Sequence, residues 1–100
     1  MNKMTKGMLK VLSRSHALEI LESLDKEPMR FVDLKGVCKS NRTRTVRLRE
    51  LKGEGLIVAI PKMSKERAYT FYEITPLGIN ALELAKRIIH LTNQGEDYSN

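Results

Sequence analysis

The chain has 100 residues, of which 41% are hydrophobic and 30% charged, and this composition fits one globular domain with a modest core. The longest uninterrupted apolar run, residues 56–60, is too short to cross a bilayer, and no secretory signal pattern opens the chain. We therefore expect a single soluble, cytoplasmic domain over residues 1–100, without a membrane partner.

The excess positive charge is concentrated in one part of the chain. Residues 39–67 hold nine basic and three acidic side chains, a local charge of +6, whereas the other 71 residues are balanced. A solvated surface is the ordinary interpretation of such a block, but clustered Lys and Arg also displace condensed counterions from a phosphate backbone. The concentration of charge favours a polyanion as partner.

The reactive residues are too few for most chemistries. A single cysteine, Cys38, excludes an intrachain disulfide, and we interpret it as a small buried hydrophobe rather than as a redox sensor. His16 and His90 have no partner at metal-ligand or nucleophile–base spacing, and the six glycines are scattered rather than gathered into a phosphate-binding loop. We expect no metal, no cofactor and no enzymatic activity.

Two helices are predicted in the first quarter of the chain. Apolar residues at helical spacing predict a helical extension over residues 1–12. Ser13 or Ser15 would cap the next helix, which ends before Pro28 because the residue preceding a proline avoids the α region. Its apolar stripe is Ala17, Ile20, Leu21 and Leu24.

The basic block begins on a third major helix. A brief helix is expected over residues 31–38, followed by a longer one over residues 41–53 with Ser40 as N-cap and Gly55 as a left-handed stop. The longer helix carries four arginines and a narrow apolar edge formed by Leu48 and Leu51. Such a polar helix is reasonable if its exposed face meets phosphates and base edges.

A β-hairpin follows, because the apolar period changes from 3.6 to 2 after Gly55. Residues 56–60 and 68–74 are rich in β-branched and aromatic side chains and are predicted strands. The polar residues 61–67 between them would form the hairpin tip, which carries three more cations.

The last helix is expected over residues 76–92, with Thr75 as N-cap and Pro76 in its first turn, before a flexible tail over residues 95–100. It carries two apolar stripes. The first has the alternating spacing of a coiled-coil seam and comprises Leu77, Ala81, Leu84, Ile88 and Leu91. The second comprises Leu82, Ala85 and Ile89. A second copy in a C2 homodimer would cover the seam, whereas one wide stripe on the domain's own core is the alternative.

This order of helices, hairpin and last helix is that of a winged helix-turn-helix, a mainly α fold with a small β-hairpin (α+β). Residues 47–57 resemble the junction between recognition helix and wing in bacterial and archaeal regulators. Residues 30–34 resemble their second helix, and residues 72–78 resemble their junction between strand and last helix. The chain is most similar to the HxlR group, followed by the MarR and ArsR groups. The resemblance implies transcription regulation, with N- and C-terminal helices forming a dimer interface.

Two departures from these families bear on function. ArsR metal sensors carry closely spaced cysteines and some HxlR regulators a reactive cysteine near the N-terminus, so neither role transfers to Cys38. Where the families have an apolar residue one turn before Leu48, this chain has Arg44. Either the helix is rotated or starts late, so that Thr45 faces inward, or Arg44 extends along the edge of the core.

We therefore expect a homodimeric, sequence-specific regulator of double-stranded DNA whose helix 41–53 enters the major groove. Arginine can bind guanine, asparagine can bind adenine, and Val or Thr methyl groups can contact thymine. On that basis the base-reading candidates are Asn41, Arg42, Thr45, Val46 and Arg49. The phosphate or wing contacts are expected from Lys39, Arg44, Arg47, Lys52, Lys62, Lys65 and Arg67, with the wing at 61–67 on the backbone or minor groove.

The alternative is a winged-helix module that binds protein or RNA without an operator. A neutral or acidic helix at 41–53 would favour a protein partner, and the four arginines count against it. An aromatic content of 5% counts against base stacking as the main mode of RNA binding. No pattern in the sequence marks a site for a small-molecule effector.

Overall fold

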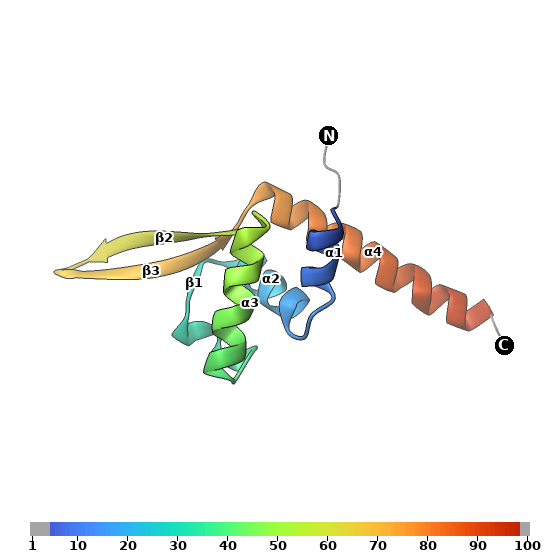
Figure 1. Ribbon diagram of the computed structural model, residues 1–100, viewed down its shortest axis with the longest axis horizontal. Coiled ribbons are helices and arrows are strands. Elements are labelled where there is room, and N and C mark those ends of the chain that lie inside the picture. Colours follow the sequence, from blue (N-terminus) through green and yellow to red (C-terminus); the bar gives the residue numbers. More distant parts are fainter. Residues whose placement is uncertain (1–4, 99–100) are drawn as a thin grey trace.

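The chain forms three helices and two short segments before a long hairpin and a last helix (Figure 1). A computed structural model describes residues 5–98. The elements are α1 (Lys6–Leu12), α2 (Ala17–Lys26), β1 (Met29–Arg30), the 3-10 helix η1 (Val32–Gly36), α3 (Asn41–Gly53), β2 (Ile57–Ser64), β3 (Arg67–Ile74) and α4 (Pro76–Tyr98). Helices α1 to α3 gather in the middle of the molecule, while the β2–β3 hairpin and α4 project to opposite sides.

Both ends of α3 are fixed by the residues that the sequence predicts. The Ser40 hydroxyl accepts a hydrogen bond from the Thr43 backbone N–H at 3.1 Å, which confirms Ser40 as N-cap. Beyond the helix Gly55 has φ +76°, and the Leu56 N–H donates to the Leu51 carbonyl at 3.0 Å. This left-handed ending favours glycine, and it directs the chain from α3 into β2.

The start of α2 differs from the prediction. Neither Ser13 nor Ser15 caps this helix; the N-cap is His16, with φ 67° and no side-chain capping bond. Ser13 instead donates to the Lys10 carbonyl at 2.8 Å, and Ser15 is bound by Arg47. Only four residues join α1 to α2, so the chain turns through a left-handed residue rather than through an extended cap.

The sheet has the strand order β1-β3-β2, with both pairs antiparallel. The hairpin is longer than expected, because pairing continues to Ser64 opposite Arg67 and leaves only Lys65 and Glu66 in the turn. The prediction of a loop over residues 61–67 is therefore wrong. This stretch is polar and includes Pro61, but β2 is an edge strand, where proline can be accommodated.

The segment after α2 is more extended than predicted. Met29 and Arg30 form β1 and pair with Tyr72 and Phe71 of β3. The helix expected over residues 31–38 is the single 3-10 helix η1. A strand of two residues is too short for any periodic signal, so the sequence pattern could not reveal it.

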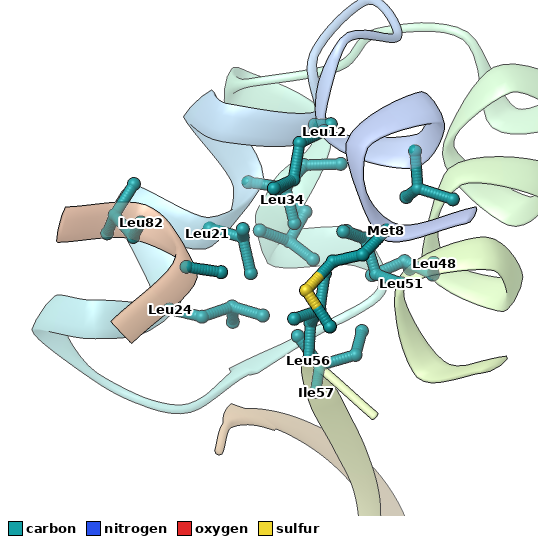
Figure 2. Packing of buried hydrophobic residues seen from close by; sticks show 14 of the residues in the cluster. Met8, Leu12, Leu21, Leu24, Leu34, Leu48, Leu51, Leu56, Ile57 and Leu82 are labelled. Atoms are coloured by element: carbon teal, nitrogen blue, oxygen red, sulfur yellow. The ribbon is translucent and has the colours of Figure 1, made fainter. Parts of the chain in front are cut away.

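One core joins all four α-helices to the base of the hairpin (Figure 2). Its buried members are Met8, Val11, Leu12, Ala17, Ile20, Leu21, Leu24, Leu34, Cys38, Leu48, Leu51, Leu56, Ile57, Ala81 and Leu82. Cys38 is fully buried among them, which confirms its interpretation as a small hydrophobe. Leu48 and Leu51 face this core and thereby fix the opposite side of α3 toward solvent.

Helix α4 begins against the junction of α3 and β2. Thr75 caps it, because its hydroxyl accepts from the Gly78 N–H at 3.0 Å and also donates to the Gly55 carbonyl at 2.7 Å. Gly78 lies so close to this junction that an added Cβ would stand 2.1 Å from the Leu56 carbonyl oxygen. The close approach lets the first turns of α4 cover the core.

The far end of α4 also departs from expectation. The helix continues to Tyr98, so the flexible tail predicted from Gly95 onward is helical through that residue, and residues 99–100 lie outside the described range. A single glycine inside a helix costs only about 1 kcal/mol, which is too little to end it. No helix within the described range is both long and apolar enough to cross a membrane.

Candidate nucleic-acid interface

The side of α3 that faces away from the core carries most of the predicted base-reading residues. Arg42, Thr45 and Arg49 are exposed, and they follow one another at spacings of three and four residues. Asn41 is exposed on the first turn, while Val46 is half-buried. The structure therefore places Arg42, Thr45 and Arg49 on one outward-facing stripe, with Asn41 exposed on the first turn and Val46 half-buried.

A hollow of about 340 Å³ separates this stripe from the sheet. Its lining combines side chains of α3 with aromatic residues from the segments beside it: Phe31, Thr45, Leu48, Arg49, Lys52 and Tyr72. Arg49 and Lys52 are exposed, so positive charge borders a concave surface between helix and hairpin. This shape and charge suit a phosphate-bearing chain.

Arg44, expected to hold a phosphate, is buried instead. Its exposed fraction is 1%, and its guanidinium carbon lies 4.3 Å from the centroid of the Phe31 ring. Thr45 is exposed, so the helix is not rotated inward at that position. The expectation of a phosphate contact is wrong for Arg44, because the inner side of α3 places it against the aromatic ring rather than at the surface.

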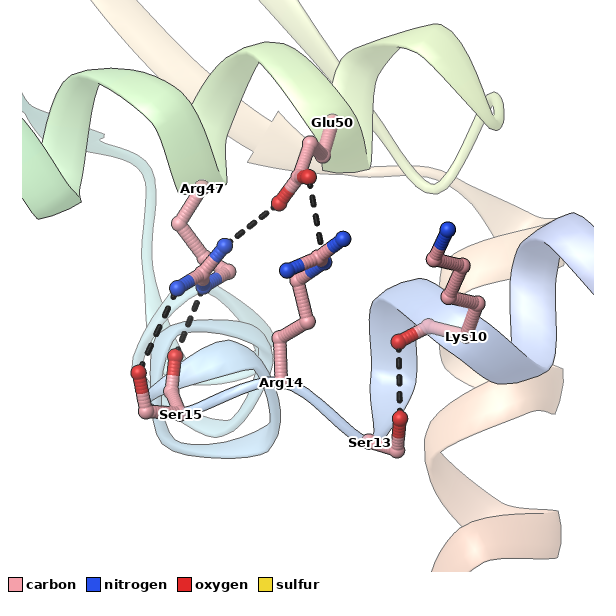
Figure 3. Close-up of polar contacts among 6 residues, drawn as sticks. All are labelled: Lys10, Ser13, Arg14, Ser15, Arg47 and Glu50. Atoms are coloured by element: carbon pink, nitrogen blue, oxygen red, sulfur yellow. Dashed lines mark hydrogen bonds and ion pairs between the residues drawn. The ribbon is translucent and has the colours of Figure 1, made fainter.

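Arg47 was also expected on a phosphate and is also buried, with 7% of its surface exposed. Figure 3 shows it reaching back to the connection between α1 and α2, where Nε donates to the Ser15 carbonyl at 2.7 Å and Nη2 to the Ser15 hydroxyl at 3.2 Å. Glu50 accepts from Arg47 and pairs with Arg14 at 3.2 Å. Arg47 therefore holds α3 against the connection between α1 and α2.

The sequence holds a signal for the second of these corrections. Glu50 follows Arg47 by three residues, a spacing at which opposite charges pair on a helix surface. An arginine with such a partner is partly neutralised and is a weaker candidate for a phosphate. The contact to Ser15 spans 32 residues in sequence and has no local signal.

The hairpin cations differ in their surroundings. Lys62 pairs with Glu73 at 3.4 Å and lies 5.1 Å from the centroid of the Phe71 ring. Its charge therefore interacts with side chains of the neighbouring strand β3. Lys65 stands at the turn with φ 55°, and Arg67 opens β3; both are exposed. Lys65 and Arg67 are the hairpin cations best placed to meet a polyanion.

One ion pair stabilises the segment between the sheet and η1. Asp33 accepts from the Arg30 side chain at 3.3 Å and from the Arg30 backbone N–H at 3.0 Å. The guanidinium hydrogen bond and the backbone bond hold the pKa of Asp33 below its ordinary value, and the same carboxylate raises the pKa of Arg30. The pair fixes the chain just before Phe31.

A second surface lies on the far half of α4. Of the predicted seam, Ala81 is 2% exposed and Leu77 packs on the core, so these two residues belong to the fold itself rather than to an interface. Leu84, Ile88 and Leu91 are 42%, 54% and 65% exposed, because α4 here extends beyond the helices that cover its first turns. Three of the five predicted seam residues are therefore uncovered, all on the C-terminal half of α4.

Next to that half lies an apolar groove of about 320 Å³ between α4 and the first two helices. Its lining is almost entirely apolar: Leu9, Leu12, Ser13, Leu18, Ala85, Ile88 and Ile89. Ile89, from the second predicted stripe, is 48% exposed. Within the described residues, the exposed members of the two α4 stripes thus share one uncovered apolar surface.

The four helices, the sheet with its projecting hairpin and the outward stripe of α3 define a winged-helix fold. A scan against protein-family models finds no match, and neither does a search among curated proteins. The class is therefore established by the fold and by its likeness to solved structures.

Solved structures of transcription regulators share this fold. The reduced form of the regulator YodB from B. subtilis aligns with a TM-score of 0.77 at 18% identity, over 92% of this chain and 94% of its own. A PadR-family regulator from Clostridium difficile aligns at 0.76 and 15% identity, over 85% and 97%. A MarR-family regulator from Enterococcus faecalis aligns at 0.74 and 20% identity, over 99% and 97%. At these identities the likeness is one of fold.

Proposed function

We propose that this protein is a sequence-specific regulator that binds double-stranded DNA. The observation that carries the proposal is the outward stripe of α3, where exposed Arg42, Thr45 and Arg49 stand beside a cationic hollow framed by the hairpin. These side chains can hydrogen-bond base edges or contact thymine methyl groups. The junction motifs in the sequence make the HxlR group our proposed affiliation.

In the proposed complex α3 enters the major groove by its N-terminal half. Asn41, Arg42, Thr45, Val46 and Arg49 are the base-reading residues. The phosphate contacts come from exposed cations around this stripe and on the hairpin: Lys39, Lys52, Lys62, Lys65 and Arg67. Arg44 and Arg47 act inside the fold and take no part in this set.

We further propose that the regulator works as a homodimer through α4. The support is the uncovered apolar surface that contains Leu84, Ile88 and Ile89, together with the adjoining groove. A two-fold arrangement would set two copies of α3 roughly 34 Å apart, one turn of B-DNA, so the preferred site would be palindromic. Each half-site would then be read by one copy.

Selection from randomised duplexes tests the proposal directly. The purified protein is incubated with a duplex library, and enriched sequences are compared with scrambled duplexes and with single-stranded RNA in direct binding. We expect a palindromic motif bound at least about 1,000-fold more tightly than scrambled DNA. Equal affinity for all duplexes would contradict sequence-specific regulation, and preference for RNA would favour an RNA-binding module.

A further inference from the structure

Arg44 lies inside the fold although its guanidinium is charged. Its Nη2 donates to Oδ1 of Asn41, and its guanidinium carbon lies over the Phe31 ring, 4.3 Å from the centroid. Nε and Nη1 are buried and have no hydrogen-bond partner among residues 5–98. A buried cation with so few partners costs folding free energy, so stability does not explain why an arginine occupies this place.

The bond between Arg44 and Asn41 determines which end of the Asn41 amide faces outward. A guanidinium has donors and no acceptor, so the amide atom that meets it must be the oxygen. Oδ1 accepts from the buried guanidinium, and Asn41 is exposed on the first turn of α3, so the Nδ2 amino group is the end of the amide whose donors remain for another partner. An asparagine without this bond can turn its amide over and present either end.

We infer that Arg44 is a positioning residue for base recognition, which holds Asn41 as a hydrogen-bond donor toward DNA. This inference rests on the proposed function and narrows it. A bidentate contact to adenine requires the amide to accept from N6 and to donate to N7, whereas the guanine edge offers the acceptors N7 and O6. Asn41 in this orientation selects guanine, and not the adenine that its residue type alone suggests.

Four proteins test the inference by duplex selection: wild type, Arg44→Met, Asn41→Ala and the double variant. Methionine keeps an unbranched apolar stem in the buried position and removes every donor. We expect wild type to prefer guanine at one base position of the selected duplex, and Asn41→Ala to lose the preference at that same position. In Arg44→Met the preference for guanine over adenine at that position falls by roughly 5- to 150-fold, the discrimination of one good base contact.

Two further comparisons separate this role from a general structural one. In the Asn41→Ala background, Arg44→Met causes no further change in base preference, because Arg44 acts through Asn41. Arg44→Lys, which keeps a donor, restores part of the preference for guanine. Selection of adenine by wild type at this position, or an unchanged preference in Arg44→Met, would overturn the inference.

A measurement without DNA gives an independent answer. Nitrogen-15 relaxation of the Asn41 side-chain amide in the free protein is expected to show a rigid group in wild type and a mobile one in Arg44→Met. The exposed amide of Asn80 on α4 serves as the reference. A rigid amide without any selected duplex would overturn the proposed function and the DNA role of Asn41. A mobile wild-type amide with a selected duplex would overturn only the role of Arg44.

Discussion

The arginines of α3 differ in their surroundings and therefore in the roles that they can have. Arg42 and Arg49 are seven residues apart, two helical turns, and both are exposed on the outward stripe, whereas Arg47 points back into the scaffold. Substitution of a side chain that contacts a base lowers the affinity for the selected DNA sequence most. Substitution of one that only neutralises a phosphate lowers the affinity for all DNA sequences about equally.

Arg42→Ala tests base reading by the first turn of α3, the proposed recognition helix. We expect it to weaken the selected duplex by roughly 1–3 kcal/mol and to affect scrambled DNA much less, because a lost base contact removes discrimination at one base pair. Fluorescence anisotropy with both duplexes measures the difference. Equal losses on the two duplexes would make Arg42 a phosphate contact.

Lys65→Ala is the matched variant at the hairpin turn. Here we expect selected and scrambled duplexes to weaken equally, and the slope of log K against log salt to fall by about one per subunit, as for a single phosphate contact. The same anisotropy titrations, repeated over a series of salt concentrations, provide both numbers. A loss confined to the selected duplex would assign the turn to base recognition.

Arg47→Ala should lower stability instead of DNA affinity. The substitution removes donors to Ser15 and leaves Glu50 with Arg14 alone, and we expect a loss of about 1–3 kcal/mol in the free energy of unfolding. Arg49→Ala, at an exposed position on the same helix, is the control and should stay within about 0.5 kcal/mol. Urea unfolding compares the two variants, and an unchanged salt slope for folded Arg47→Ala excludes a phosphate contact.

Asp33 predicts a pH dependence with a definite sign. Arg30 holds the pKa of the Asp33 carboxyl below its unfolded value, so the pair stabilises the fold above about pH 4 and loses this effect as the pH falls through the folded pKa. Asp33→Asn should therefore melt at a lower temperature than wild type at pH 7, and the gap should narrow steadily as the pH falls below about 4. A gap that does not change with pH in this acid range would show that the carboxylate charge is not responsible.

Among the secondary-structure elements, α4 begins at a very close backbone contact, which Gly78 permits because it has no side chain. Gly78→Ala would place a Cβ against the Leu56 backbone oxygen, which cannot move aside as a flexible side chain can, and should cost about 1–3 kcal/mol. Gly53→Ala is the control, since the added Cβ would meet nothing within 4 Å. This substitution should be neutral or should stabilise the fold by up to about 1 kcal/mol. Thermal unfolding of both variants decides the matter.

The elements whose ends carry local signals were predictable from sequence. Ser40 and Gly55 frame α3, and Thr75 with Pro76 opens α4, because capping depends on residues adjacent in the chain. The two-residue strand β1 forms only by pairing with β3, and Arg47 binds Ser15 across 32 residues. Such contacts between distant segments leave no periodic pattern in the sequence. The candidate site followed the same division. Its exposed stripe and the pairing of Arg47 with Glu50 have local signals, whereas the contact of Arg47 with Ser15 and the packing of Arg44 on Phe31 depend on tertiary structure.

For the molecule as a whole, the hairpin and α4 give an elongated shape of 60 × 32 × 22 Å. In the proposed dimer, about 3–5 cations per subunit would meet phosphates, so log K against log salt should have a slope of about −5 to −9. The count uses exposed cations only. Filter binding across salt concentrations measures the slope, and a value near zero for the selected duplex would remove the electrostatic basis of the interface.

Leu84→Glu and Ile88→Glu test the proposed assembly. Both side chains are on the uncovered half of α4, so a charge there is tolerated in a monomer and is desolvated only if a second copy packs on it. We expect these variants to be folded monomers by light scattering and circular dichroism, with wild type a dimer. Folded dimers in both variants would place the interface elsewhere.

The uncovered end of α4 also makes the stability of the fold depend on protein concentration. If a second copy is what shields this surface, part of the free energy that keeps each chain folded comes from association and grows with the logarithm of protein concentration. Diluting the protein should then lower its melting temperature, while the Ile88→Glu chain should melt at one temperature at every dilution. A regulator built this way would become less stable to unfolding, and not merely lose its partner, when the cell makes too little of it.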